Sequence, residues 1–243
     1  MDNHSFVTAG GVVVPALTTD QMREVDRIAI EEVGPNLYQM MENAGRNLAL
    51  AVIEHLGDRW NTAHVVVLAG TGGNGGGGIC AARHLANRGC DVTVLVDEAG
   101  LGGVPGEQLR VYRGTPGRVA RIEELGTLSA DLIVDAVIGY SLGGPPRGRP
   151  LEMIDWASSV AAPKLSLDVP SGIDSTTGEA PGAHVVAAAT LTLALPKTGL
   201  AAPAVGDLSL ADIGIPAEVY RRLGIEVPAT VFGDRFRVGL RIR

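Results

Sequence analysis

The sequence has few cysteines, few aromatic residues and no excess of positive charge. Its 243 residues include 2 cysteines and 4% aromatics, and 20 Lys and Arg against 27 Asp and Glu give a formal net charge of −7. Cys80 and Cys90 cannot form a disulfide framework or a CxxC metal site, so we expect a reduced, cytoplasmic chain. The acidic balance disfavours binding to nucleic acid or to an anionic membrane surface.

Long hydrophobic runs are also missing. The longest run, 185–195, includes Thr190 and Thr192 and is too short to cross a bilayer, so it is predicted to be a buried strand. The first residues, 1–4, lack the basic region of a signal peptide. The 5 histidines show no metal-ligand spacing. Because 46% of the residues are hydrophobic, we expect a globular chain with a substantial core.

Glycine, in contrast, is abundant. The 33 glycines have no fixed period, which excludes a collagen-like repeat. They gather at 70–78, 100–106 and 139–148, each time after an apolar run. Each cluster is therefore predicted to be a loop that leaves a strand.

Alternating apolar runs and helical patterns predict an α/β fold. Thr18 and Gln21 fit a capping box that opens a first helix, which ends before Gly34, and a second helix is predicted at 38–56. Further helices are predicted around 81–86 and 151–160. Because the strands are almost continuously apolar, we expect a doubly wound, mostly parallel sheet preceded by N-terminal helices. The predicted strands are 64–69, 91–96, 132–137, 164–168, 185–195 and 208–213.

The C-terminal residues, 235–243, alternate between apolar and mostly basic side chains. Such alternation is typical of a half-buried strand. We favour an edge strand protected by its charges over a strand that binds a partner. The apolar positions are Phe236, Val238, Leu240 and Ile242.

Polar side chains follow three of the predicted strands. Asn74 lies in the first glycine-rich loop, Asp135 near the end of the strand 132–137, and Asp168 at the end of the strand 164–168, with Ser171 in the next turn. The carboxyl ends of parallel strands share one edge of a sheet, where ligands bind. Asn, Asp and Ser oxygens suit an alkali or alkaline-earth cation, and Asp168 would be free to transfer a proton.

Each of these features has a simpler interpretation. The loop 70–78 fits neither a P-loop nor a clear dinucleotide fingerprint, so it could be a flexible turn. Asp135 could cap a loop, and the turn around Ser171 could be an ordinary one. Cys80, near a helix start, is either a thiol of lowered pKa or a small core residue.

Six short motifs occur in order between Thr18 and Ile215. Together they resemble the NAD(P)H-hydrate epimerase family, which is also called the YjeF N-terminal domain family or apolipoprotein A-I-binding-protein-like. The resemblance implies a three-layer α/β/α Rossmann-like fold and a single domain over 1–243, with an extension at 1–17 and a basic amphipathic tail at 235–243. The motifs are Gln21-Met22-Arg23 with Asp26, Met41-Glu42-Asn43-Ala44-Gly45, 70–78 with Ala82-Arg83-His84-Leu85, Val134-Asp135-Ala136 with Gly139-Tyr140-Ser141, Asp168-Val169-Pro170-Ser171-Gly172 and Pro196-Lys197-Thr198-Gly199-Leu200.

The resemblance also implies an activity and its residues. Family members interconvert the R and S forms of hydrated NADH and NADPH, are usually homodimers, and work with an ADP- or ATP-dependent dehydratase that acts on the S form. Asn74, Asp135 and Ser171 match potassium ligands, and Asp168 matches a substrate-binding carboxylate that is the candidate acid/base. The implied substrate-binding residues are Gly73, Asn74, Gly75, Gly76, Gly77, Gly139, Tyr140, Ser141, Leu142, Gly143, Gly144, Pro145 and Asp168.

The chain departs from the family pattern in one loop. That loop typically reads Asn-Asn-Gly-Gly-Asp-Gly, whereas Gly73 and Gly77 here replace the first Asn and the Asp. Two alternative functions therefore stay open, because one fold hosts many functions. One is an inactive or repurposed scaffold that binds a nucleotide-like ligand or a protein partner, and the other is a different acid/base isomerase or lyase in the same pocket. An NAD(P)-dependent dehydrogenase is a poorer interpretation, since the fingerprint is imperfect and no hydride-transfer partners are evident.

Overall fold

The computed structural model describes residues 5–243, so the first four residues of the predicted extension and domain lie outside it. A single 10-stranded sheet runs through the molecule in the order β2-β1-β10-β9-β8-β7-β6-β3-β4-β5. Strands β3 to β9 are mutually parallel, and β10, β1 and β2 are added antiparallel at one side. The strands are β1 (Phe6–Thr8), β2 (Val13–Val14), β3 (His64–Ala69), β4 (Asp91–Val96), β5 (Arg118–Ala120), β6 (Leu132–Ala136), β7 (Lys164–Leu167), β8 (Ala189–Leu193), β9 (Asp207–Ala211) and β10 (Arg237–Ile242).

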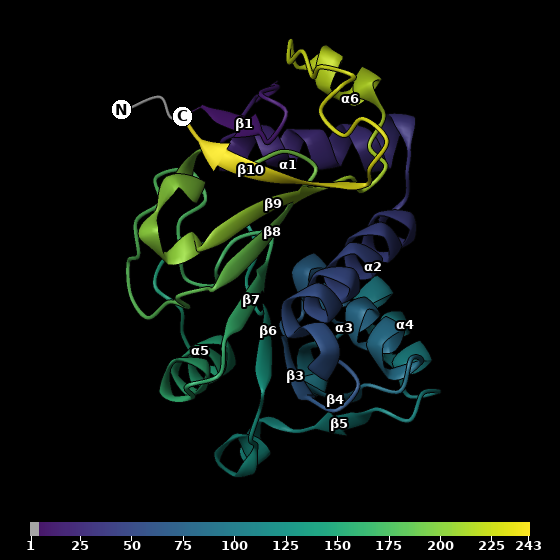
Figure 1. Ribbon diagram of the computed structural model, residues 1–243, viewed down its shortest axis with the longest axis vertical. Helices are drawn as coiled ribbons and strands as arrows, with labels where there is room; N and C mark the ends of the chain where they lie inside the picture. The colour runs from purple at the N-terminus through teal and green to yellow at the C-terminus, as the bar shows by residue number, and fades with distance from the viewer. Residues whose placement is uncertain (1–4) are drawn as a thin grey trace.

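Helices cover both faces of this sheet, with α2, α3 and α4 on one side and α5 on the other (Figure 1). The α-helices are α1 (Thr19–Ile28), α2 (Leu37–Leu56), α3 (Gly73–Ala86), α4 (Gly103–Tyr112), α5 (Arg149–Ser159) and α6 (Ala217–Arg222). A π-helical turn, Ala29–Val33, follows α1. Short 3₁₀ helices occupy Gly57–Arg59, Glu98–Gly100, Ile122–Thr127, Thr198–Ala201 and Pro203–Val205.

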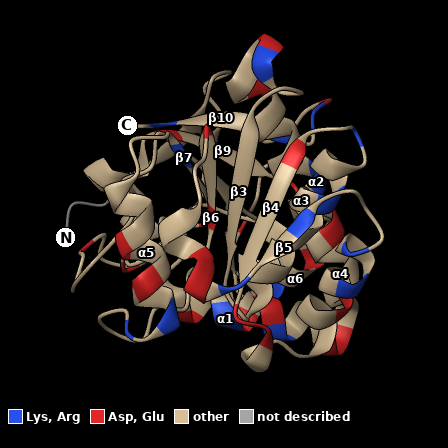
Figure 2. Cartoon of the chain, turned by 90° about the horizontal axis from the view of Figure 1, so that it is seen from below, with Lys and Arg blue, Asp and Glu red and all other residues tan. Residues whose placement is uncertain are grey.

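The two faces of β3 show how the sheet divides the core. Val65 and Val67 belong to the cluster that packs against α2, α3 and α4. Val66 and Leu68 point the other way, into the cluster beneath α5. Charged side chains lie mainly on helices and loops, and β3 carries none (Figure 2). The predicted α/β fold with a mostly parallel sheet and helices on both faces is confirmed.

The N-terminal helices form as their sequence predicts. Thr18 Oγ1 accepts a hydrogen bond from the Gln21 amide, and the Gln21 side chain accepts one from the Thr18 amide, which completes the capping box at α1. Asn36 and Gln39 form the same arrangement at the start of α2. Each pair satisfies backbone N–H groups that a helix start leaves without partners.

The glycine run is the largest departure from the predicted secondary structure. The stretch 73–78 is not a loop, because α3 already begins at Gly73. A Cβ added at Gly75 would stand 1.8 Å from the Gly70 carbonyl oxygen, and one added at Gly78 would stand 2.5 Å from the Ala136 Cβ. The glycines therefore let α3 approach the β3 and β6 ends closely, rather than making a turn.

The C-terminal strand was also placed wrongly by its pattern. It forms β10, but β10 lies between β9 and β1 and is not an edge strand. Leu240 pairs with Thr8 and is buried, so the N-terminal segment covers what would otherwise be an exposed edge. Four other strands are shorter than predicted. The run 185–195 contributes only Ala189–Leu193, 208–213 contributes Asp207–Ala211, and β6 and β7 each end one residue early.

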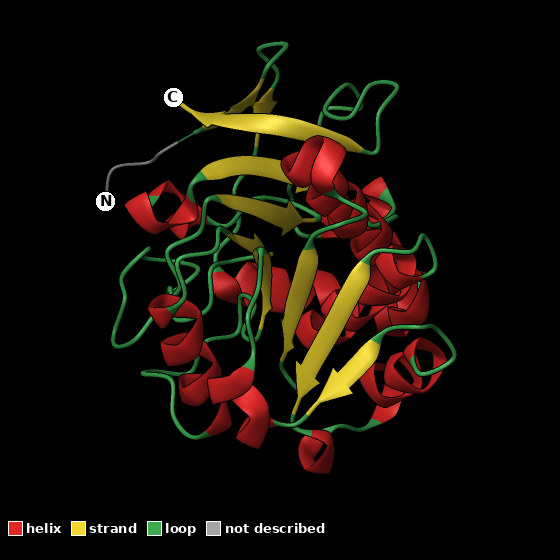
Figure 3. Ribbon diagram, turned by 60° about the horizontal axis from the view of Figure 1, so that its bottom comes forward, coloured by secondary structure: helices red, strands yellow, loops and turns green. Residues whose placement is uncertain are grey.

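The sheet order reverses at β3, which has β4 on one side and β6 on the other (Figure 3). The chain leaves β3 and β6 in opposite directions, so a crevice opens beyond their carboxyl ends, the usual ligand position in open α/β sheets. Within residues 5–243, no helix combines the length and the apolar character needed to cross a membrane.

Candidate active site

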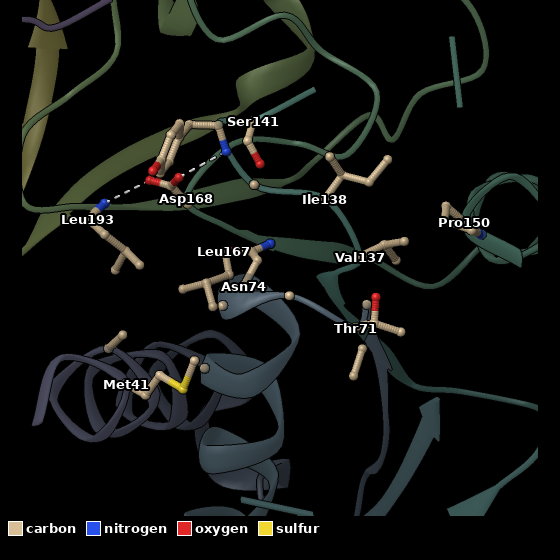
Figure 4. A pocket seen from close by; sticks show the side chains of 18 of the residues that line it. Met41, Thr71, Asn74, Val137, Ile138, Ser141, Pro150, Leu167, Asp168 and Leu193 are labelled. Carbon is tan, nitrogen blue, oxygen red and sulfur yellow. Dashed lines mark hydrogen bonds between the residues drawn. The ribbon is translucent and has the colours of Figure 1, made fainter. Parts of the chain in front are cut away.

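A cavity of about 720 Å³ lies at this reversal of strand order. Its walls come from α1, α2, the start of α3, α5, and the segments that follow β3, β4, β6, β7, β8 and β9; Figure 4 shows part of this lining. The size is that of a small-molecule site. Its polar side chains include Asp26, Asn74, Asp97, Tyr140, Ser141, Arg149, Asp168 and Lys197.

Asp168 occupies a strained turn at the end of β7. Its φ is 69°, and the Val169 amide donates to the Leu167 carbonyl oxygen at 2.9 Å, so the turn is a γ-turn centred on Asp168. Left-handed φ is rare for residues other than glycine and is concentrated at functional positions. The turn aims the carboxylate at the backbone amides of Tyr140 and Leu193, 3.2 and 3.3 Å away (Figure 4).

Lys197 forms a buried ion pair with Asp168. The lysine side chain is 1% exposed and the aspartate side chain 5%. The Lys197 ammonium also donates to the Leu193 carbonyl oxygen at 2.9 Å and lies 5.8 Å from the centre of the Tyr140 ring. Lys197 stands in one of the sequence motifs but was not predicted to be a site residue. Its position shortly after the apolar strand β8 was the available signal.

A second acidic group reaches the cavity from α1. The Tyr140 hydroxyl donates to Asp26 at 2.6 Å. Burial raises the pKa of the Asp26 carboxyl, and this hydrogen bond partly offsets the shift. Burial and the nearby Asp26 carboxylate raise the pKa of the Tyr140 phenol. Asp26 was also missed as a site residue, although it shares a helix face with the buried Met22.

Asp135 and Ser171 meet beneath the cavity floor. Asp135 is fully buried in β6 and accepts hydrogen bonds from the Ser171 amide at 2.8 Å, the Ser171 hydroxyl and the Ser166 hydroxyl at 2.7 Å. Burial raises the pKa of the Asp135 carboxyl, and these hydrogen bonds oppose the rise. Ser171 also accepts a hydrogen bond from the Ile138 amide at 2.8 Å, which fixes the loop after β6.

Asn74 supplies the third member of the predicted cation site. Its side chain lies beside Gly139, where an added Cβ would be 3.2–3.4 Å from Asn74 side-chain atoms. Within residues 5–243, its buried amide nitrogen has no hydrogen-bond partner. Turning the amide over would present its oxygen there instead. The Asn74 amide lies against Gly139, and the Ser171 hydroxyl bonds to the preceding residue, Ile138. An amide, a carboxylate and a hydroxyl are oxygen donors that suit an alkali cation.

The cavity includes some of the predicted substrate-binding residues and leaves out others. It is lined by Gly73, Asn74, Gly77, Gly139, Tyr140, Ser141 and Asp168. The glycines next to them in α3, and the four residues after Ser141, lie outside its walls. These are Gly75, Gly76, Leu142, Gly143, Gly144 and Pro145.

At Gly77 the cavity wall is apolar. A Cβ added there would stand 2.9 Å from the tip of the Leu167 side chain, and Leu167 lines the same cavity. Gly77 is a helical residue of α3, so it does not loosen a loop. The carboxylate expected from the family pattern is therefore replaced by helix backbone and a leucine methyl group.

A separate polar cluster joins α2 to α3. Glu42, Cys80 and His84 bring one potential ligand atom each within 4.8 Å of one another, a grouping that sequence spacing did not indicate. The Arg83 guanidinium already contacts all three side chains, so a positive charge fills the cluster. Of the two alternatives for Cys80, the small core residue agrees with the structure, because Cys80 is buried and burial raises the pKa of its thiol to about 12.

Comparison with known proteins identifies the family. A model described as "YjeF-related protein N-terminus" matches residues 37–199. The chain belongs to this family. An NAD(P)H-hydrate epimerase of Dehalogenimonas lykanthroporepellens is 51% identical over 222 residues, which cover 91% of each chain. The predicted family membership is therefore confirmed.

Two further relatives extend the comparison. A bifunctional NAD(P)H-hydrate repair enzyme, Nnr, of Hyperthermus butylicus is 38% identical, and the match covers 84% of this chain but 40% of that protein. The crystal structure of yeast ynu0 (YNL200c) matches with a TM-score of 0.80 at 23% identity, covering 93% of this chain and 100% of that chain. The yeast structure shows that the two chains share a fold.

Proposed function

We propose that this chain is an NAD(P)H-hydrate epimerase, which interconverts the R and S forms of hydrated NADH and NADPH. The observation that carries the proposal is the buried Asp168–Lys197 pair, held by a strained turn at the wall of a cavity where open α/β sheets bind ligands. The 51% identical relative, which bears this name and aligns over nearly its whole length, supports it.

The reaction needs proton transfer and no net oxidation. In the hydrated cofactor, one nicotinamide ring carbon carries a hydroxyl group and is bonded to the ring nitrogen. Protonation of the hydroxyl lets it leave as water, and return of water to the other face, with loss of a proton, gives the other epimer. A side chain that gives and takes back this proton supplies general acid–base catalysis. We assign that proton transfer to Asp168, and Lys197 and the Tyr140 amide hold its carboxyl group in place.

The remainder of the substrate is a dinucleotide with a pyrophosphate. The first backbone N–H groups of α3, at Gly73 to Gly75, have no side-chain cap and follow a glycine-rich turn. A helix start of this kind favours anions. We assign pyrophosphate binding to Gly73, Asn74 and the neighbouring glycines. The loop from Gly139 through Ser141 to Pro145 is assigned to the rest of the substrate.

We also propose a potassium ion bound by Asn74, Asp135 and Ser171. The unsatisfied Asn74 amide and the fully buried Asp135 carboxylate support this assignment. Bound there, the ion would supply positive charge that offsets the burial of Asp135. The chain's own contribution is to fix the loop after β6 through the Ser171–Ile138 hydrogen bond.

The proposal includes a partner enzyme and a cellular compartment. In relatives named bifunctional the matched region is 40–42% of the length, which supports a second repair activity acting on the same substrate, for which we propose the dehydratase. Two buried cysteines without a disulfide support a reducing, cytoplasmic setting. The homodimer rests on family resemblance alone.

A coupled assay tests the proposal. Purified protein is mixed with the R form of hydrated NADH and a dehydratase specific for the S form, and the recovery of NADH is measured. The wild-type chain should accelerate NADH recovery well beyond spontaneous epimerisation. Asp168→Asn should lower kcat by about 10²–10⁴-fold, the usual contribution of acid–base catalysis. Asp155→Asn, the same change on the exposed face of α5, should leave the rate unchanged.

Two controls complete the assay. Circular dichroism checks that each variant is folded, and replacing potassium by sodium tests the assigned ion. Folded wild-type protein that fails to accelerate the recovery of NADH would reject the epimerase. A ligand-binding or partner-binding scaffold would then be the better account of the Gly77 substitution.

A further inference from the structure

A second cavity, of about 420 Å³, lies between α2 and the C-terminal segment. It shares no lining residue with the first cavity. Its walls come from the outer face of α2, the C-terminal end of α3 and the residues that enter β10. The proposed epimerase reaction uses none of these residues, and the basic tail that the sequence singled out forms one wall.

The lining of this cavity is strongly basic in an acidic chain. It contains Arg46, Arg88, Arg235 and Arg237 but only one carboxylate, Glu54. Glu54 contacts Arg237, which neutralises one of the four guanidinium groups.

The other three arginines lack close carboxylate partners. Within residues 5–243, no carboxylate lies within 4.0 Å of Arg46 or Arg88, and Arg235 has only the highly exposed Asp234 at 3.9 Å. Like charges gathered around a concave site repel one another, and an anion inside it would relieve that repulsion.

An apolar surface accompanies these charges. Phe236 is 64% exposed and Leu50 46% exposed, and both line the cavity. The Phe236 backbone is fixed, because its carbonyl oxygen accepts the Asp212 amide at 2.9 Å as the chain enters β10. An exposed aromatic ring on a fixed backbone can stack on a flat ring of a ligand.

We propose that this cavity binds a small aromatic phosphate ester of the nucleotide class. Arg46 and Arg88 would contact the phosphate, because a planar guanidinium donates two parallel hydrogen bonds to phosphate oxygens. Phe236 would stack on the base. The cavity volume lies in the range of small-molecule sites.

A tryptophan at position 236 reports on this cavity when the emission of Trp60 and Trp156 is subtracted, by repeating each titration on the chain that keeps Phe236. The full chain carrying Phe236→Trp is titrated with AMP, inorganic pyrophosphate and adenosine at constant ionic strength, and its fluorescence is followed. AMP and pyrophosphate should change the tryptophan emission. Adenosine, which lacks the phosphate, should bind at least about tenfold more weakly than AMP, a loss of about 1.4 kcal/mol.

Two double variants in the same reporter chain test the arginines. Arg46→Gln with Arg88→Gln should weaken AMP binding at least about tenfold, because charged hydrogen bonds to the phosphate are lost. Arg59→Gln with Arg110→Gln removes the same charge from exposed positions outside the cavity and should leave AMP binding unchanged. Epimerase turnover should stay at the wild-type rate in both.

Three results would overturn this assignment. They are no change in emission with AMP or pyrophosphate, equal binding of adenosine and AMP, or an equal effect of the two arginine pairs. Because the reporter lies outside the first cavity, failure here would leave the epimerase assay untouched, and failure of that assay would leave this one valid.

Discussion

Replacing Lys197 by methionine tests how much the buried ion pair stabilises the fold. Methionine keeps a long side chain at a position that is 1% exposed but removes the charge. The Asp168 carboxylate would then keep only neutral donors: the amides of Tyr140 and Leu193 and the Thr192 hydroxyl. Breaking a buried pair by removing one partner typically costs about 3–5 kcal/mol. We expect a loss of that size in the free energy of unfolding, measured in urea.

A double-mutant cycle separates the pair from its surroundings. Asp168→Asn alone leaves a buried ammonium without its partner, whereas Asp168→Asn with Lys197→Met leaves no buried charge. The double variant should therefore lose less than the sum of the single losses, by about 1–3 kcal/mol. Arg113→Met, which breaks an exposed pair with Glu98, should cost about 1 kcal/mol or less. Additive losses, or a Lys197→Met loss as small as this control's, would refute the reasoning.

Three further predictions concern other parts of the fold. Burial raises the pKa of the Cys80 thiol to about 12, so iodoacetamide should modify Cys80 only after denaturation, as mass spectrometry would detect; rapid labelling of folded protein would contradict this. Burial raises the pKa of Asp26 above 3.8, so the folded state keeps this proton to higher pH than the unfolded chain does. The unfolding free energy of the wild type should therefore fall relative to that of Asp26→Asn as pH rises from 3.8 through the raised pKa of the folded state. Urea titrations at a series of pH values measure both free energies, and an equal pH dependence in the two proteins would contradict this prediction. Leu240→Ala should cost about 2–5 kcal/mol in urea unfolding, but Ile242→Ala, on the exposed part of the same strand, should cost about 0.5 kcal/mol; equal losses would argue against burial of Leu240.

The parallel part of the sheet was readable from the sequence. Strands β3 and β4 have the predicted bounds, and β6 and β7 each end one residue earlier than predicted. These strands are buried on both faces, so they are almost continuously apolar and end where polar residues and glycines begin. The strand predicted over the run 185–195 was too long. Residues on either side of β8, such as Val185 and Leu195, are buried and apolar without being in a strand.

The sequence pattern could not predict the order of strands at the edge formed by β10, β1 and β2. Alternation in the tail predicts a strand but says nothing about its neighbours. Thr8 pairs with Leu240, and Gly239 pairs with Ser209, so β10 joins segments from both ends of the chain. Only the long-range topology decides that β10 is internal.

The site was partly predictable for the same reason. The rule that ligands bind at the carboxyl ends of parallel strands correctly singled out Asp168 as a cavity residue and led to the buried contact between Asp135 and Ser171. Lys197 obeys the same rule, because it follows the parallel strand β8, but Asp26 does not. Asp26 comes from α1 and reaches the cavity only through tertiary packing.

The glycine run 73–78 was predicted to be a loop but is helical, and its position 77 matters for the proposed reaction. Glycine is a poor helix former, so a run of glycines favours a turn when it is considered alone. At Gly75 an added Cβ would meet backbone, which cannot move aside, whereas at Gly77 it would meet only the tip of Leu167. Position 77 therefore has no strict packing need for glycine, and its missing carboxylate is a change in the cavity wall. Asp168, to which we assign the proton transfer, pairs with Lys197 through contacts that do not involve position 77, so the substitution at Gly77 leaves this arrangement in place.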